Sequence, residues 1–128
     1  MISHTTIGVS DVHAARRFYD PLLERLGLVL KFADDKWAGW KQPENERPLF
    51  IIMRPFDGKP ASAGNGQMIA LVAATRTLVD VCHSLGVQHG GGDEGKPGLR
   101  PEYHANYYGA YLRDPDGNKL CVCCHDSE

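Results

Sequence analysis

Residues 107–125, YYGAYLRDPDGNKLCVCCH, decide how this chain folds. Two alternating segments flank the DPDG sequence at 114–117, in which proline presets the turn dihedral, aspartate caps its own backbone and glycine supplies a positive φ. The pattern predicts a β-hairpin with strands at 107–113 and 118–124. Because side chains alternate along a strand, two of the three cysteines in the final strand share one face and the third lies on the other.

The hairpin ends the second of two similar halves of the chain. Residues 4–11 and 68–75 are both β-type runs that end in a helix N-cap candidate. Apolar residues spaced three and four apart follow each run, a pattern typical of an amphipathic helix. Both patterns end in Leu-Gly, at 26–27 and 85–86, where glycine suits the left-handed position that closes a helix. Pro21 lies inside the first pattern and predicts a break at the two residues before it.

Further strand-like runs complete both halves of the chain. They lie at 28–33, 36–41 and 48–54, and then at 87–90, 107–113 and 118–124. The chain therefore reads as two βαβββ modules, about 1–57 and 66–128, joined by the Gly- and Pro-rich residues 57–66. Residues 90–106 form a second irregular stretch, of a length that is usually a functional lid or a disordered segment.

The composition restricts the class of protein. With 128 residues and 42% hydrophobic content, the chain suits one compact domain. The formal charge of −2 gives no basic field for nucleic acid and no polybasic segment for membranes. No apolar run approaches the roughly 20 residues of a transmembrane helix, and the first residues lack the pattern of a signal peptide. Three of the four cysteines crowd into one strand, a poor disulfide framework, so we expect reduced thiols in the cytoplasm.

Three segments carry a resemblance to a known family: HTTIGVSDVHAARRFYD at 4–20, GNGQMIALVA at 64–73 and YLRDPDGNKL at 111–120. Together with the two modules, they resemble the vicinal oxygen chelate superfamily, which includes glyoxalase I, extradiol dioxygenases, and fosfomycin and bleomycin resistance proteins. The resemblance covers nearly the whole chain and implies one glyoxalase-like domain, residues 1–128. It implies an α+β fold in which two βαβββ modules form a cupped mixed-sheet barrel, and it implies a homodimer.

The resemblance also implies where a metal site would lie. In metal-dependent members, the first and fourth strands of each module supply a His, Glu, His, Glu set. The first position falls on His4, which matches, but the others fall near residues 52–54, on Met68 and on Cys121, where no carboxylate or second histidine is present. Divalent metals of this kind prefer imidazole and carboxylate ligands. We therefore expect no cofactor; the alternative is a divalent metal with an altered ligand set.

Two other interpretations of these positions stay open. Imidazole, thioether and thiolate together suit Cu(I), so His4, Met68 and Cys121 are a candidate soft-metal set. Met68 and Cys121 equally suit apolar filling of a vacated site. Cys121 is also a candidate nucleophile, which needs a base or a positive neighbour, and His4 would be that partner if the two strands face each other.

Aromatic and polar residues are the candidates for ligand binding. They are Trp37, Arg54, Met68, Tyr103, His104, Tyr107 and Tyr108. Tyr107 and Tyr108 face opposite ways by alternation, so at most one of them lines the cup. Arg54 and Arg100 are candidates to hold a carboxylate or phosphate. Binding sites commonly combine such aromatic walls with a few polar groups.

These residues favour a glyoxalase-like protein that binds a small organic molecule in the cup without the divalent-metal site. One alternative is a lyase, similar to lactoylglutathione lyase, or an isomerase or dioxygenase with an altered ligand set. Another is a resistance-type protein that sequesters a drug or metabolite. We do not expect glyoxalase I activity, because that chemistry needs a metal and a carboxylate that moves the proton.

Overall fold

The computed structural model describes residues 1–128 and confirms two βαβββ modules in sequence. The first module contains β1 (His4–Gly8), α1 (Val12–Arg25), β2 (Val29–Ala33), β3 (Trp37–Lys41) and β4 (Leu49–Met53). The second contains β5 (Ile69–Val72), α2 (Arg76–Gln88), β6 (Gly92–Leu99), β7 (Tyr108–Arg113) and β8 (Lys119–Cys124). Neither helix has the length and apolar composition that crossing a membrane requires.

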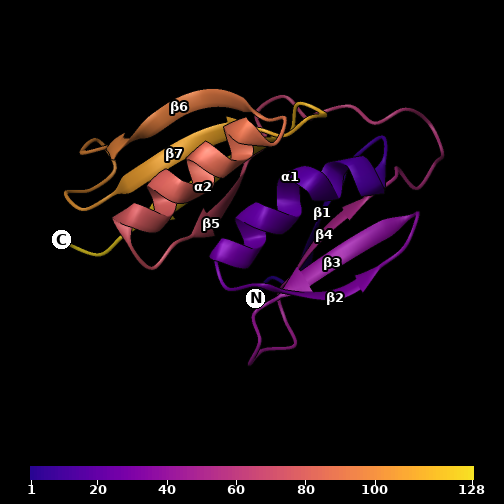
Figure 1. Cartoon of the computed structure of the whole chain (residues 1–128), viewed down its shortest axis with the longest axis horizontal. Coiled ribbons are helices and arrows are strands. Elements are labelled where there is room, and N and C mark those ends of the chain that lie inside the picture. The colour runs from indigo at the N-terminus through magenta and orange to yellow at the C-terminus, as the bar shows by residue number, and fades with distance from the viewer.

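Each module forms its own four-stranded mixed sheet. β1 pairs in parallel with β4, and β5 pairs in parallel with β8, whereas the remaining pairs are antiparallel. The strand orders are β1-β4-β3-β2 and β5-β8-β7-β6, so β1 and β5 each have an unpaired edge. The cup is therefore built from two sheets that do not close into a barrel, and both helices lie over the same side of them (Figure 1).

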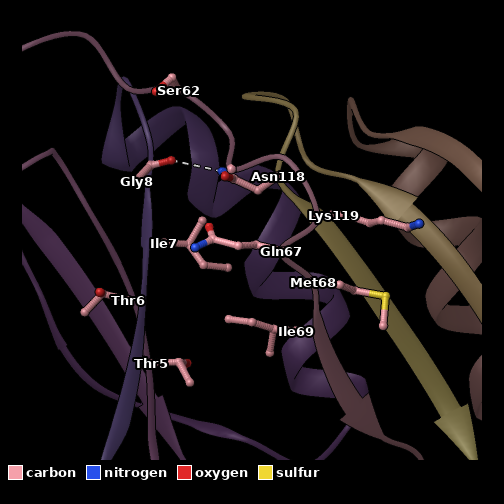
Figure 2. Close-up of a pocket in the computed structure, with 12 residues that line it drawn as sticks. Thr5, Thr6, Ile7, Gly8, Ser62, Gln67, Met68, Ile69, Asn118 and Lys119 are labelled. Carbon is pink, nitrogen blue, oxygen red and sulfur yellow. Dashed lines mark hydrogen bonds between the residues drawn. The ribbon is translucent and has the colours of Figure 1, made fainter.

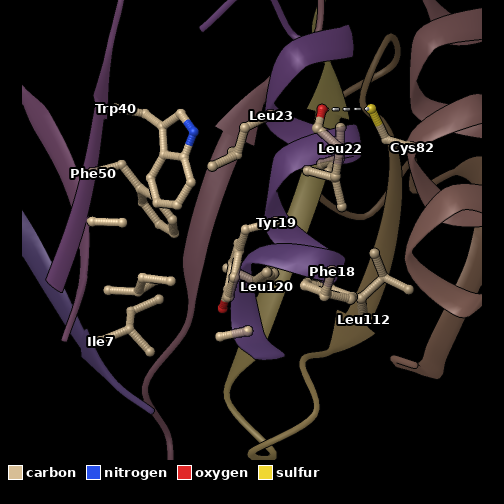
Figure 3. Packing of buried hydrophobic residues seen from close by; sticks show 14 of the residues in the cluster. Ile7, Phe18, Tyr19, Leu22, Leu23, Trp40, Phe50, Cys82, Leu112 and Leu120 are labelled. Carbon is tan, nitrogen blue, oxygen red and sulfur yellow. Dashed lines mark hydrogen bonds between the residues drawn. The ribbon is translucent and has the colours of Figure 1, made fainter. Parts of the chain in front are cut away.

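Helix α1 joins the two modules through one core (Figure 3). Tyr19 faces the first sheet, with its ring centroid 5.6 Å from that of Phe50 and 6.3 Å from that of Trp40. Phe18 faces the second sheet and lies beside Leu112 of β7 (Figure 3). A single cluster of 20 buried residues therefore spans both modules and covers the helix-facing side of both sheets.

Helix α1 begins as predicted but does not break. Asp11 is its N-cap, and the side chain accepts a hydrogen bond from the backbone N–H of Ala14. The helix continues through Pro21, so the break expected at the two preceding residues is wrong. Phe18 before the proline and Leu22 after it are fully buried in the same core. This shared burial holds both turns in line, although one backbone hydrogen bond is missing.

Helix α2 ends later than its Leu-Gly pair predicted. It continues through Gly86 to Gln88, and the positive φ of 98° falls on Gly90. The strand expected at 87–90 is therefore wrong. Gly86 serves close packing instead, since a Cβ at this position would lie 2.7 Å from Leu112. Glycine adjacent to leucine thus marked the end of the first helix, where Gly27 has a φ of 82°, but not of the second.

The segment 90–106 contains a strand that sequence patterns did not reveal. Residues 92–99, GDEGKPGL, form β6, which pairs only with β7 and with two shifts of register. Three glycines and Pro97 remove any alternation of apolar and polar side chains. An edge strand tolerates proline because one side of its backbone needs no partner. The expectation that all of 90–106 is irregular is therefore wrong.

The closing hairpin is confirmed. β7 and β8 lie within the predicted strands, and Gly117 has the predicted positive φ, at 89°. Oδ1 of Asp114 accepts hydrogen bonds of 2.9 Å from the backbone N–H groups of Asp116 and Asn118. The turn therefore fixes the register that places every second residue of β8 on the face away from the helices.

Candidate functional site

The two faces of the second sheet differ in chemistry. Tyr108 faces the helices, and its hydroxyl donates a 2.6 Å hydrogen bond to Oδ1 of Asp80 in α2. Cys124 also belongs to the core, whereas Cys121 and Cys123 are buried on the opposite face. The two tyrosines therefore face opposite ways, as alternation predicted, and Tyr108, a predicted ligand-binding residue, lies on the helix side of the sheet.

A pocket of about 870 Å³ lies over the helix-free face of this sheet. It is lined by Met68, Tyr103, His104, Tyr107, Tyr111, Arg113, Lys119, His125 and residues 63–67, which include the end of the linker. No aspartate or glutamate is among them. The structure thus brings together four residues predicted from the sequence, Met68, Tyr103, His104 and Tyr107. Sequence reasoning missed Tyr111, although counting by two from Tyr107 along β7 would have found it.

Glycine shapes the aromatic wall of this pocket. Gly109 follows Tyr107 by two residues on the same face, and a Cβ there would lie 2.8 Å from the Tyr107 ring. The bare glycine therefore lets the ring lie back along β7. Its centroid is then 4.9 Å from the Tyr103 ring and 5.4 Å from the His125 ring. These contacts bring His125, near the end of the chain, to the two tyrosine rings around the start of β7.

A directed chain of hydrogen bonds runs from the loop before β7 to the Cys123 thiol of β8. The backbone N–H of Asn106 donates to Nδ1 of His104 at 3.1 Å, so the proton of the neutral His104 ring lies on Nε2. This Nε2 is 2.8 Å from Nδ1 of His125, whose own proton then lies on Nε2. That nitrogen is 3.6 Å from Sγ of Cys123. Each donor therefore points towards β8.

Cys121 contacts the aromatic wall of the pocket. The Tyr107 hydroxyl lies 3.4 Å from Sγ of Cys121 and 3.1 Å from the Tyr111 hydroxyl. The neighbouring Cys123 thiol is the main cause that lowers the pKa of Cys121 from 9.0 to about 7, against the opposing effect of burial and with a smaller effect from Tyr107. The Cys121 thiol in turn raises the pKa of Cys123, and burial raises the pKa of Tyr107.

Positive charge surrounds the same face. Lys119 lines the pocket, its Nζ is 5.6 Å from the Tyr111 ring centroid, and no carboxylate lies within 4.0 Å of it. The Arg100 guanidinium is also 5.6 Å from that ring and donates only to backbone carbonyl groups. Arg113, in contrast, forms a 3.0 Å ion pair with Glu94. Two cations near the pocket are therefore free of a carboxylate partner.

A smaller pocket of about 470 Å³ lies between the unpaired edges of β1 and β5 (Figure 2). Thr5, Thr6 and Ile7 line one side, and Gln67 extends towards them from the residues before β5. At one end, the Nδ2 amide of Asn118 donates a 2.9 Å hydrogen bond to the carbonyl of Gly8. Met68 lines both pockets and so lies at the boundary between the two modules.

The remaining predicted residues lie elsewhere. His4 is exposed, its Nδ1 is 2.9 Å from the Ser3 hydroxyl, and it lines neither of the two pockets around Met68. It was the candidate partner of Cys121 if their strands faced each other, but the side-chain contact of that thiol is with Tyr107 of its own sheet. Trp37 packs at a tilt against Phe32 in the first sheet, with centroids 4.6 Å apart, and Arg54 is exposed beyond β4.

The residues at the four family positions do not fit a divalent metal. The second position falls on Ile52, which is fully buried in the core, and on its neighbours Met53 and Arg54. Met68 and Cys121 supply sulfur in place of a histidine and a carboxylate. No group of three or more His, Cys, Asp or Glu side chains is placed to hold a metal ion. Of the three residues of the Cu(I) set, only Met68 lines either of these pockets.

Comparisons with known proteins agree with this fold. A family model described as Glyoxalase/Bleomycin resistance protein/Dioxygenase superfamily matches residues 1–122. A glyoxalase/bleomycin resistance protein from Albidiferax ferrireducens T118 is 36% identical, with a TM-score of 0.86 over 98% of this chain and 99% of that one. A glyoxalase-related enzyme from Fulvimarina pelagi is 20% identical, with a TM-score of 0.74 over 97% and 87% of the two chains.

A lactoylglutathione lyase from Agrobacterium tumefaciens has the same fold at greater distance. It is 20% identical, with a TM-score of 0.64 over 97% of this chain and 92% of that one. No curated protein matches the sequence. Similarity at this level of identity concerns the fold alone, so the function must be argued from the residues of the site.

Proposed function

This chain belongs to the Glyoxalase/Bleomycin resistance protein/Dioxygenase superfamily, and from that premise we propose that it binds a small aromatic organic anion without the divalent metal of the metal-dependent members. The observation that carries the proposal is the pocket over the second sheet, which combines aromatic rings with cations and has no carboxylate in its lining. Pockets of this kind bind ligands by apolar contact and use a few polar groups for orientation.

The aromatic rings supply the apolar part of the proposed site. Tyr103 is 64% exposed and stands at the mouth of the pocket, so it is available to a ligand. Tyr107 and His104 lie behind it, with ring centroids 5.6 Å apart. A planar ligand would stack on such rings. One aromatic pair contributes about 0.5–1.5 kcal/mol of favourable free energy in addition to the contribution from burial of apolar surface.

The cations supply the proposed selectivity for an anion. Lys119 has no carboxylate partner and lies in the pocket lining. Hydrogen bonds between an ammonium group and a carboxylate are about twice as strong as those between neutral groups. An anionic ligand would therefore be favoured over a neutral one of the same shape. Because no carboxylate lines the pocket, the lining does not repel an anionic ligand.

Binding of 1-naphthoate, compared with the neutral 1-naphthalenemethanol, tests this proposal. Calorimetric titration is expected to give tighter binding of the carboxylate. The Lys119→Gln substitution should weaken naphthoate binding by roughly tenfold, since it removes one charge-assisted hydrogen bond. Lys59→Gln is the matched control, because Lys59 is exposed and lines neither pocket. Equal affinity for both compounds, or equal loss in both variants, would contradict the proposal.

We propose binding, and not hemithioacetal isomerisation, as the function of the site. That reaction needs a group that moves a proton at the metal-bound substrate, and the four family positions supply no carboxylate for it. Sequestration of a ligand, as in the resistance proteins of the family, requires only the pocket. A measurable rate of hemithioacetal isomerisation after addition of Ni²⁺ or Zn²⁺ would contradict this assignment.

We also propose that two chains associate as a homodimer. The unpaired edges of β1 and β5, and exposed apolar side chains such as Val72 at 68%, support this assembly. Multi-angle light scattering after size-exclusion chromatography should give twice the chain mass of 14.1 kDa. A monomer mass at micromolar concentration would contradict the dimer and leave the proposed pocket, which lies within one chain, unaffected.

A further inference from the structure

The two pockets around Met68 are continuous with each other. Their linings share Gly64, Gly66, Gln67, Met68 and Lys119. The larger pocket is lined by aromatic rings and cations, whereas the smaller one is lined mostly by small and polar residues, of which Lys119 is the only charged one. A ligand that fills both pockets therefore needs an aromatic end and a polar, uncharged end.

The edge of β1 presents unpaired backbone groups to the smaller pocket. The N–H of Val9 donates to the Met53 carbonyl of β4 at 2.9 Å, whereas the Gly8 carbonyl accepts from the Asn118 amide on the opposite side of the strand. Because the backbone groups of successive residues alternate between the two edges of a strand, the N–H and C=O of Thr6 face the same way as those of Gly8. No strand pairs with β1 on this side, so both groups of Thr6 are available to a ligand.

The side chain of Gln67 extends across the gap towards this edge. It points from the residues before β5 towards Ile7 of β1 (Figure 2), and its amide forms no hydrogen bond with another residue. Gly64 makes room for it, since a Cβ at that position would overlap the Gln67 amide. A side chain in this place leaves space for a small molecule and not for the strand of a second chain, whereas Val72 at the far end of β5 stays exposed.

We propose that the joined pockets bind an N-acyl aromatic amino acid. The aromatic ring lies over the second sheet, the carboxylate binds Lys119, and the amide lies in the smaller pocket between Thr6 and Gln67. The α-carbon of such a molecule carries all three groups, and Lys119 lies where the two pockets meet, with its side chain extended away from the smaller one (Figure 2). The inference rests on the proposed function for the ring and the carboxylate, and it adds the amide, which names the class of ligand.

The amide of this ligand finds a partner for each of its polar groups. Its N–H donates to the Thr6 carbonyl, as in the main-chain pairing by which an open strand edge binds a peptide. Its carbonyl oxygen accepts a hydrogen bond from the Gln67 amide. An amide that leaves water without such partners would bind at a cost in free energy. The ligand 3-phenylpropionate has the same ring and carboxylate but no amide, so it uses neither partner.

Calorimetric titration of the full chain with three compounds tests the proposal. They are N-acetyl-L-phenylalanine, its D enantiomer and 3-phenylpropionate. One enantiomer should bind roughly tenfold more tightly than 3-phenylpropionate, because it adds two hydrogen bonds. The other enantiomer should bind more weakly, since three groups fixed at one carbon cannot all reach their partners in the mirror image. Equal affinities for the three compounds would overturn the proposal.

Two glutamine variants test the place of the amide. Gln67→Met keeps the length of the side chain but removes its amide, so it should bring the affinities for the preferred enantiomer and for 3-phenylpropionate close together. Gln88→Met is the matched control, because Gln88 is exposed at the end of α2 and lines neither pocket. It should preserve the ratio of the two affinities. A ratio that survives in Gln67→Met, folded by circular dichroism, would overturn the amide site.

The two proposals fail separately. Naphthoate binding that depends on Lys119, with no preference for the N-acetyl compounds over 3-phenylpropionate, would keep the anion site and remove the amide site. Binding of one N-acetyl enantiomer that depends on Gln67 but is unchanged in Lys119→Gln would keep the amide site and remove the anion site. Absence of binding by all of these compounds at millimolar concentration would overturn both.

Discussion

At the scale of single residues, Tyr19 links the core to the turn that begins the final strand. Its ring is fully buried, and its hydroxyl donates a 2.5 Å hydrogen bond to Oδ2 of Asp114, which is itself only 3% exposed. The same carboxylate accepts hydrogen bonds from residues 116 and 118. A buried carboxylate is costly unless its oxygens are paired, so the tyrosine and the turn stabilise each other.

Removal of this hydroxyl should destabilise the protein. Tyr19→Phe leaves Oδ2 of the buried Asp114 with one donor fewer, and it should lower the free energy of unfolding by about 1–3 kcal/mol. Tyr103→Phe, at an exposed tyrosine, should leave it unchanged within about 0.5 kcal/mol. Urea denaturation followed by circular dichroism measures both. Equal midpoints for the two variants would show that the hydrogen bond adds nothing to stability.

At the same scale, the sequence identified several site residues but not their partners. Aromatic character and alternation were enough to select Tyr103, His104 and Tyr107. The partner of Cys121 required the fold, because His4 belongs to the other sheet, whereas pairing of β7 with β8 brings Tyr107 to the sulfur. Hydrogen bonds between strands depend on register, which the residues of one strand alone do not specify.

At the scale of elements, the connection between α2 and β6 depends on close packing at glycine. A Cβ on Gly91 would lie 2.8 Å from the backbone carbonyl oxygens of Gly86 and Arg113, and it would also overlap the Phe18 ring. Backbone oxygens cannot move away without displacing the helix or the strand. The glycine therefore sets how closely β6 and β7 approach the end of α2.

The substitution Gly91→Ala should destabilise the protein by about 1–3 kcal/mol, as expected of overpacking. The adjacent Gly92→Ala is the matched control, because a Cβ there would have no neighbour closer than 3.9 Å. Thermal unfolding monitored by calorimetry compares the two. If Gly92→Ala lowers the melting temperature as much as Gly91→Ala, backbone freedom and not packing is the reason that glycine occupies this segment.

The element boundaries that sequence reasoning missed have a common cause. Pro21 and Gly86 are both poor helix residues, and both lie inside helices because tertiary contacts outweigh local preference. In β6, by contrast, the sequence lacks a pattern for the element that forms. Its glycines and Pro97 show no alternation of apolar and polar residues, and it is a strand only because it pairs with β7. Periodicity reports the faces that pack against a core, and β6 has no such face.

At the scale of the whole molecule, the cup carries sulfur and aromatic groups where metal-dependent relatives would carry ligands. Elemental analysis of protein purified without chelator should therefore find no stoichiometric Ni, Zn, Mn or Fe. His4→Ala should leave the small residual content unchanged, since His4 lies apart from Met68 and Cys121. One bound equivalent that disappears in His4→Ala would contradict this assignment and restore a metal-dependent function.

The sequence by itself determined the two βαβββ modules, the closing hairpin and the missing carboxylates, because these depend on residue identity, turn chemistry and short-range periodicity. Only the tertiary structure decided that the modules form two unclosed sheets, that the pocket lies over the second sheet alone, and that Cys121 is bonded within that sheet. These features arise from pairing and packing between segments far apart in the chain. No local pattern specifies which distant side chain will meet a given thiol.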